Sequence, residues 1–198
     1  GHTHSWIRMK KVAELQASMI MFPHRHGHSP HSWRQIVDVM LEKIPGHPFS
    51  HKLRLIALLE SKFNISLRAI WPRLLMPNAE RLGLLSPRQK GGRRGFQTYD
   101  CLLMQILSMT LCRITFINAI ISNYDASKCF DRILLSLAGL LARRAGAPPS
   151  MIRTNIKTKR DATHHVQSAH GLSADSYSGS TDEPLQGEGQ GCVMRANP

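Results

Sequence analysis

The spacing of hydrophobic residues near the start of the chain predicts a helix. Ser32 and Gln35 stand three residues apart, as in a helix capping box, and apolar side chains then recur at helical spacing. We therefore expect a helix from about Trp33 to Lys43, which the Pro45-Gly46 pair stops.

A different spacing follows, in which an apolar face recurs at every second position. Leu53, Leu55, Ala57 and Leu59 share one alternating face, and Arg54 lies on the other. A period of two is typical of a strand with one buried face. This segment is therefore expected to be a strand that exposes Arg54.

Helical patterns return in the middle of the chain. Residues 62–71 and 78–85 have helical spacing, but Pro72 and Pro77 interrupt them, which indicates either short helices or a damaged sequence. Residues Tyr99 to Leu111 are almost wholly apolar. We expect this third segment to be a buried helix.

An aspartate then separates a strand-like segment from an amphipathic helix. Residues 114–121 are rich in β-branched side chains, and residues 133–141 carry a leucine stripe at helical spacing that Gly146 ends. A carboxylate at the end of a strand can bind Mg²⁺ and a triphosphate, so Asp125 is a candidate ligand, with a turn or cap residue as the alternative. Asp131 is expected to cap the helix.

The charge of the chain points to a polyanionic partner. The 198 residues include 26 Lys and Arg against 13 Asp and Glu, giving a formal net charge of +13 and a pI near 10.3. Nucleic acid is the leading candidate, and nonspecific binding to acidic surfaces is the alternative. The length allows one domain or two small ones.

Cysteine spacing and hydropathy indicate an intracellular protein. The four cysteines form no CxxC pair, which fits a reducing compartment, and no apolar stretch approaches the ~18 residues needed to cross a membrane. The first residues lack both an initiating Met and a signal peptide, so we expect a cut end. Nucleus and cytoplasm are both compatible with these features.

Histidines are concentrated in residues 1–31, which we expect to form a disordered polar leader. Gly27 and Pro30 break any helix that could align these side chains, and no Cys or carboxylate lies close enough to complete a metal site. A solvated linker is therefore preferred to a metal centre. The histidines in question are His24, His26, His28 and His31.

A glycine-rich basic loop at residues 88–97 is a candidate phosphate contact. Glycines allow the backbone to approach a phosphate closely, and the loop carries four cations. A solvated basic turn is the alternative, and the pattern of a Walker-type loop is absent. The four cations are Arg88, Lys90, Arg93 and Arg94.

The segment YDASKCFD, from Tyr124 to Asp131, closely resembles the first palm motif of reverse transcriptases from eukaryotic retroelements, particularly the non-LTR kind. Further segments resemble other parts of that family in the same order. They are KLRLIALLESKFN at 52–64, RLGLLSPRQKGGRRGF at 81–96, HHVQSAHGLSADSY at 164–177, and PLQGEGQGC at 184–192, the start of the second palm motif. Together they cover most of residues 33–198.

The resemblance implies an α+β fold that is part of a right-hand polymerase, with helix-rich fingers over 32–118 and an incomplete palm over 119–198. It also implies Mg²⁺, an RNA template, a DNA primer and deoxynucleotide triphosphates as partners. Asp125 would bind both catalytic metal ions, and the backbone carbonyl of Ala126 would contact one of them. Phe130 would exclude a ribose 2′-OH, unless it is a core phenylalanine. Further nucleotide-binding residues would be Arg54, which holds the triphosphate, and Gln190 and Gly191.

The chain also lacks a feature of that family. In that family the remaining catalytic carboxylates come from an aromatic-x-Asp-Asp turn, and no such turn occurs in these 198 residues. Two Mg²⁺ ions need more than one carboxylate. We therefore expect a reverse transcriptase fragment without the third palm motif and thumb that does not polymerise alone. The alternative is a non-catalytic basic nucleic-acid-binding module. The two hypotheses differ in the role of Asp125, which binds Mg²⁺ only in the first.

Overall fold

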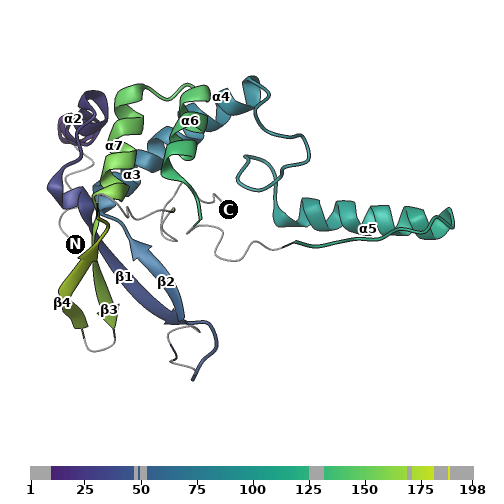
Figure 1. Ribbon diagram of the computed structural model, residues 1–198. Helices are drawn as coiled ribbons and strands as arrows, with labels where there is room; N and C mark the ends of the chain where they lie inside the picture. Colours follow the sequence, from purple (N-terminus) through teal and green to yellow (C-terminus); the bar gives the residue numbers. More distant parts are fainter. Residues whose placement is uncertain are drawn as a thin grey trace.

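The computed structural model combines a helical body, a four-stranded sheet and one projecting helix (Figure 1). It describes residues 10–46, 49, 53–124, 132–168, 171–180 and 187. The chain contains both helices and a β-sheet, which is compatible with the expected α+β class.

The sheet joins two hairpins side by side. Its strands are β1 (Gln35–Glu42), β2 (Leu53–Leu58), β3 (Thr163–Ser168) and β4 (Gly171–Ser178), in the order β2-β1-β3-β4. β1 and β2 are antiparallel, β1 and β3 are parallel, and β3 and β4 are antiparallel. The pairing of β1 with β3 joins segments from both sides of the expected boundary at residue 118.

Strand β1 occupies the segment for which a helix was predicted, so that prediction is wrong. Ile36, Val37 and Val39 are β-branched, which favours a strand, and Ile36 and Asp38 are buried on one face. This short apolar run fits the spacing of a helix as well as that of a strand, and pairing with β2 and β3 decides in favour of the strand. The predicted strand at residues 53–59 is confirmed by β2, on which Arg54 is exposed.

The helices other than α5 form the body above the sheet (Figure 1). The described helices and helical turns are α2 (Lys10–His26), the 3₁₀ turn η1 (His31–Arg34), α3 (Ser61–Ile70), the π turn η3 (Trp71–Leu75), α4 (Met76–Arg81), α5 (Thr98–Ile114), α6 (Leu135–Arg144) and α7 (Pro149–Arg160). None of the helices in the described part of the chain is long and apolar enough to span a membrane.

The two helical pieces predicted around Pro72 and Pro77 are present as α3 and α4. The π turn η3 connects them without a break, and each proline lies within the first two residues of its turn or helix. Because the helical path is continuous, each proline removes a backbone hydrogen bond to the preceding turn. The wider π turn η3 lies at this interruption, and the path continues through both prolines.

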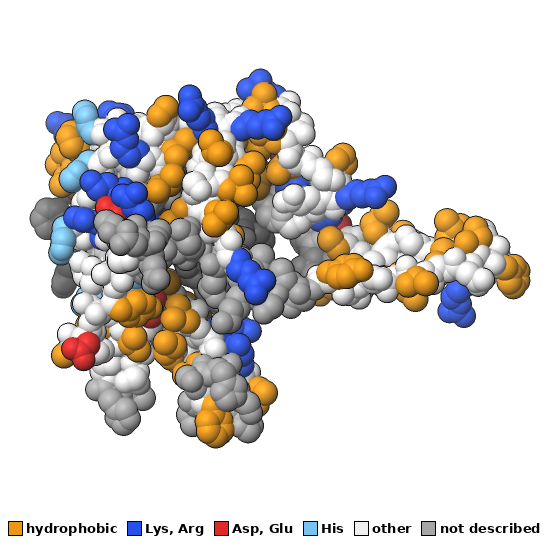
Figure 2. Space-filling model, viewed as in Figure 1, with side chains coloured by type: hydrophobic (Ala, Val, Ile, Leu, Met, Phe, Trp, Pro, Cys, Tyr) orange, Lys and Arg blue, Asp and Glu red, His pale blue; other side chains and the backbone are white. Residues whose placement is uncertain are grey.

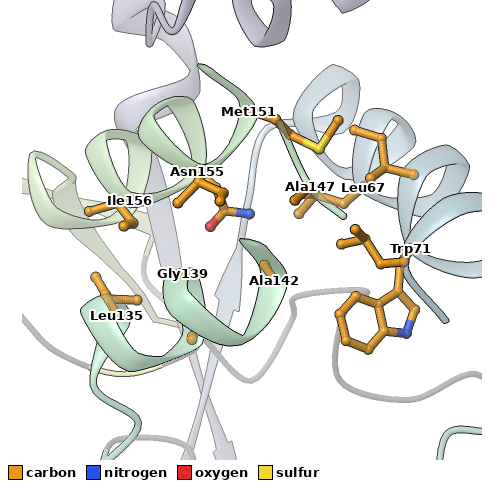
Figure 3. Close-up of a pocket in the computed structure, with 13 residues that line it drawn as sticks. Leu67, Trp71, Leu135, Gly139, Ala142, Ala147, Met151, Asn155 and Ile156 are labelled. Carbon is orange, nitrogen blue, oxygen red and sulfur yellow. The ribbon is translucent and has the colours of Figure 1, made fainter. Parts of the chain in front are cut away.

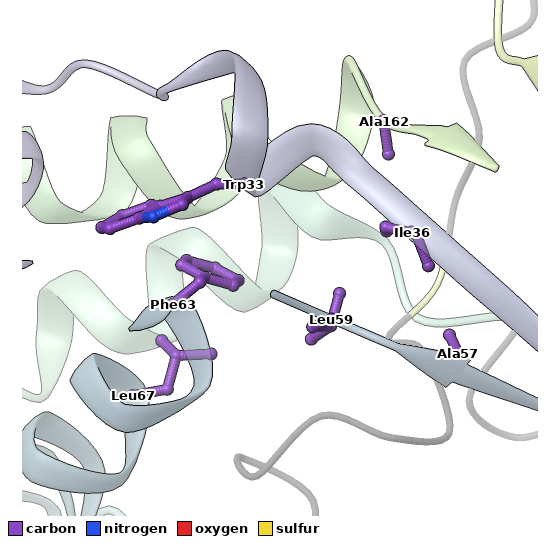
Figure 4. Packing of buried hydrophobic residues seen from close by; sticks show 7 residues of the cluster. All are labelled: Trp33, Ile36, Ala57, Leu59, Phe63, Leu67 and Ala162. Carbon is purple, nitrogen blue, oxygen red and sulfur yellow. The ribbon is translucent and has the colours of Figure 1, made fainter. Parts of the chain in front are cut away.

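Two apolar clusters hold the body together. The first lies where the sheet meets α3, and Phe63 at its centre is completely buried (Figure 4). Its residues are Trp33, Ile36, Ala57, Leu59, Phe63, Leu67 and Ala162. The second lies among the helices and comprises Ile70, Leu75, Ala79, Ala145 and Ala147.

Residues 10–26, part of the segment expected to be a disordered leader, form helix α2. The end of α2 packs against the body, because His24 is buried beside Trp33 and Phe63. His24 is buried through its contacts with these aromatic rings, although the polar composition of the segment suggested exposure to solvent.

Helix α5 has the predicted position but not the predicted burial. It projects from the body, and almost all of its apolar side chains are exposed (Figure 1). The strand predicted at residues 114–121 is also absent, since Ile114 ends α5 and residues 117–124 have no regular structure. The predicted leucine-stripe helix is confirmed by α6, which ends beside Gly146 in the left-handed conformation.

Candidate nucleic-acid interface

A basic groove runs between α6 and α7. Its volume is about 650 Å³, and four exposed cations line it. Arg143 belongs to α6, whereas Arg153, Lys157 and Arg160 belong to α7. The groove therefore presents positive charge from both of its walls.

The three cations of α7 share one face because they stand at i, i+4 and i+7. They extend over roughly 10 Å of helix. A nucleic-acid strand carries one charge about every 3.4 Å along the helix axis, so the row matches about three phosphates. Among the described residues no carboxylate lines the groove, although Arg160 forms an ion pair of 3.0 Å with Asp161 beside it.

Gly139 determines how closely the two helices approach. A Cβ atom at this position would lie 2.9 Å from Ile156 Cδ1 and 3.0 Å from Ile152 Cγ2. The absence of a side chain thus lets α6 lie directly against α7, which positions Arg143 opposite the cations of α7. Figure 3 shows Gly139 and Ile156 at this crossing.

An apolar pocket lies behind the crossing, lined partly by Leu67, Trp71 and Met151 (Figure 3). Its volume is about 40 Å³. This space admits a group little larger than one water molecule, whose share of liquid volume is about 30 Å³. The pocket is therefore a small packing gap rather than a site for a nucleotide base.

The predicted basic loop has a defined internal structure. Arg93 Nε lies 3.0 Å from Glu80 Oε1, and the Arg93 guanidinium also donates to the backbone carbonyl of Gln89 at 3.2 Å. Lys90 Nζ lies 4.2 Å from the centre of the Phe96 ring. Arg88 and Arg94 are exposed, so the loop presents these two cations while the other two also stabilise its conformation.

Lys and Arg side chains are distributed over the helical body, among apolar side chains (Figure 2). Arg54, the predicted triphosphate ligand, lies elsewhere, on the edge strand β2 opposite Leu41. The other predicted site residues lie outside the described part of the chain, so their roles stay predictions. These residues are Asp125, Ala126, Phe130, Gln190 and Gly191.

A polar cluster on the sheet was not anticipated from the sequence. Asp38 is completely buried, and its Oδ2 accepts a hydrogen bond from the Tyr177 hydroxyl and lies 2.8 Å from His164 Nδ1. The rings of His164 and Tyr177 stack with centroids 5.0 Å apart. Burial raises the pKa of Tyr177, and the hydrogen bond to Asp38 and the charge of Asp38 raise it further.

This cluster joins three strands, because Asp38 belongs to β1, His164 to β3 and Tyr177 to β4. The elevated pKa keeps the Tyr177 hydroxyl protonated, so it remains a donor to the carboxylate. A charged residue inside the apolar run of β1 was the only sequence signal for it. Both contacts involve Oδ2, whereas Oδ1 of Asp38 is buried with no hydrogen-bond partner among the described residues. The two contacts therefore offset only part of the cost of burying this carboxylate.

The histidines form no metal centre within the described residues, which contain no group of three or more metal-ligating side chains. His24 Nε2 instead lies 2.7 Å from Ser66 Oγ. Burial lowers the pKa of His24 to about 4, so this side chain is neutral at pH 7.

Comparison with protein-family models and with curated proteins finds no match to this chain.

Proposed function

We propose that this protein binds nucleic acid through the groove between α6 and α7. The observation that carries the proposal is the row of cations on α7 facing Arg143 across a groove whose described lining residues include no carboxylate. Phosphate contacts of this kind give affinity without sequence specificity. The net charge of +13 adds long-range attraction for the same polyanion.

The groove also sets the expected salt dependence. Four phosphate contacts would give a slope of log K against log salt of about −3 for a single strand. The exposed cations Arg88 and Arg94 of the basic loop would contribute further contacts if the bound strand extends to them. The slope therefore estimates how many phosphates are neutralised.

The test compares two charge reversals that change the net charge equally. Lys157→Glu alters the groove, whereas Lys62→Glu alters an exposed lysine of α3 outside it. Binding to a labelled single-stranded RNA is measured by fluorescence anisotropy over a salt series. We expect Lys157→Glu to weaken binding about tenfold or more and to reduce the slope by about one.

Lys62→Glu is expected to weaken binding by much less. Equal losses in the two variants would show that binding depends on net charge alone, which would contradict a role for the groove. Circular dichroism verifies that each variant remains folded, since both lysines are exposed.

The order of the reverse transcriptase-like segments supports a second proposal, that the chain derives from such a domain. In this proposal Asp125 would hold Mg²⁺, which would supply charge neutralisation at a triphosphate. The described residues offer it no cluster of metal ligands. We therefore expect binding of Mg²⁺ to be weak and template-directed synthesis to be absent for this polypeptide alone.

Asp125→Asn separates this proposal from nucleic-acid binding alone. If Asp125 holds Mg²⁺, titration with the ion changes the intrinsic fluorescence or the affinity for a deoxynucleotide triphosphate, and Asp125→Asn removes that change. A response that is identical in both proteins would contradict the proposed role. Primer extension by the 198-residue chain would overturn the expectation of inactivity.

A further inference from the structure

The apolar arm formed by residues 98–124 is a large exposed surface with no described partner. It consists of α5 and the segment that returns beside it, to which Gln105 is connected by a hydrogen bond to Asn123 (Figure 1). Fourteen of its large apolar side chains are exposed, and Phe116 and Ile120 are each 94% exposed. A helix that is apolar on all sides is normally buried.

The exposed area exceeds what a monomer usually carries. The largest apolar patch of a typical monomeric protein is ~300–600 Å². Aromatic side chains alone cover roughly 150–250 Å² each, and the arm has three aromatics among its fourteen exposed side chains. One side of the arm therefore offers an area comparable with the ~800 Å² per partner of a stable interface.

Charge does not oppose a second copy of this chain as the occupant of the arm. Asp100 and Arg113 are the only charged residues of the arm, so its net charge is zero and the +13 of the chain belongs to the rest of the molecule. Two copies repel each other through their bodies but not through their arms. An antiparallel pair of arms would also separate the bodies by the length of α5, roughly 25 Å for 17 residues.

The sequence of the arm suits pairing with itself. Residues Ile114 to Ile121 are uncharged, contain neither Pro nor Gly and are rich in β-branched side chains. Such segments pair readily with identical copies. We infer that two copies of this chain associate through their arms, antiparallel to each other, to form a dimer.

Sedimentation velocity on the full chain tests this inference, after nuclease treatment and at a salt concentration that releases nucleic acid. Apolar association persists under these conditions, whereas dimers bridged by RNA dissociate. The matched variants are Leu107→Lys on α5 and Met19→Lys on α2, at side chains that are 53% and 63% exposed. Each adds one charge and removes no buried contact.

We expect a concentration-dependent dimer that Leu107→Lys weakens about tenfold or more, with little change in Met19→Lys. A wild-type chain that stays monomeric, equal effects of the two variants, or assemblies larger than a dimer would each overturn the inference. Binding of a different protein to the arm, with no self-association, would also overturn it.

The two cysteines of α5 test the antiparallel orientation. Cys101 and Cys112 are free and nearly equidistant from the middle of the helix. A short bifunctional thiol reagent should link Cys101 to the partner's Cys112. The two cysteines within one chain are roughly 16 Å apart along the helix, beyond the reach of a short reagent. Links between identical cysteines would show a parallel pair and contradict the proposed arrangement.

Discussion

His24 shows how the surroundings of one residue make stability depend on pH. Burial lowers the pKa of His24 to about 4, against 6.5 when unfolded. Between these values the unfolded state binds more protons, so stability is complete above pH 6.5 and falls toward pH 4. We expect the free energy of unfolding to fall by on the order of 2–3 kcal/mol over this window from His24 alone.

Urea denaturation at several pH values measures this dependence. His24→Asn removes the titrating group and should flatten the profile between pH 6.5 and 4, although it lowers stability overall. His26→Asn provides the matched control, because His26 is exposed on the same helix. An unchanged profile in His24→Asn would show that other groups cause the pH dependence.

Individual residues also show where the sequence was insufficient. The cluster around Asp38 could not be predicted from the sequence, because its partners His164 and Tyr177 lie more than 120 positions later. Arg54 was correctly expected to be exposed, since a strand alternates its faces whatever its partners. Local patterns predict the face of a residue, whereas its contacts depend on the tertiary fold.

At the scale of elements, Gly139 controls the crossing of α6 and α7. Gly139→Val would push its methyl groups against Ile152 and Ile156, which a Cβ would already meet at 3.0 and 2.9 Å. We expect this overpacking to reduce the free energy of unfolding by about 1–3 kcal/mol, although valine is the better helix former. Chemical denaturation measures the change.

The control for this prediction is Leu137→Val, which places the same side chain at an exposed position of α6. It should change stability by no more than about 0.5 kcal/mol. A loss in Gly139→Val no larger than that of the control would mean that the helices can separate without cost. RNA binding is expected to weaken in Gly139→Val, because Arg143 moves away from α7.

Several elements could be predicted from the sequence because their patterns are long or sharply ended. The leucine stripe of α6 and the alternation of β2 are examples. The segment of β1 was misassigned because eight residues fit both a helix and a strand, and only its neighbours β2 and β3 decide. The sequence also indicated a basic loop but not the α6–α7 groove, which depends on the crossing at Gly139.

At the scale of the whole molecule, the cationic groove and the apolar arm are separate regions. The groove cations belong to the helical body, whereas the arm carries no net charge (Figure 2). An antiparallel dimer would hold two grooves at opposite ends of one particle. Such a particle could bind a long RNA at two places, and the second contact would benefit from a high effective concentration.

This separation predicts that association and RNA binding fail independently. Leu107→Lys should bind an RNA too short to reach two grooves as tightly as the wild-type chain, because it changes no groove residue. On a long RNA it should bind more weakly than the wild type, because a monomer loses the second contact. Lys157→Glu should remain dimeric while its affinity falls for both lengths. Anisotropy with two RNA lengths measures the affinities of each variant, and sedimentation measures its dimerisation. If each variant lost both dimerisation and short-RNA binding, one shared surface would perform both functions, and the assignment of separate roles to the arm and the groove would be wrong.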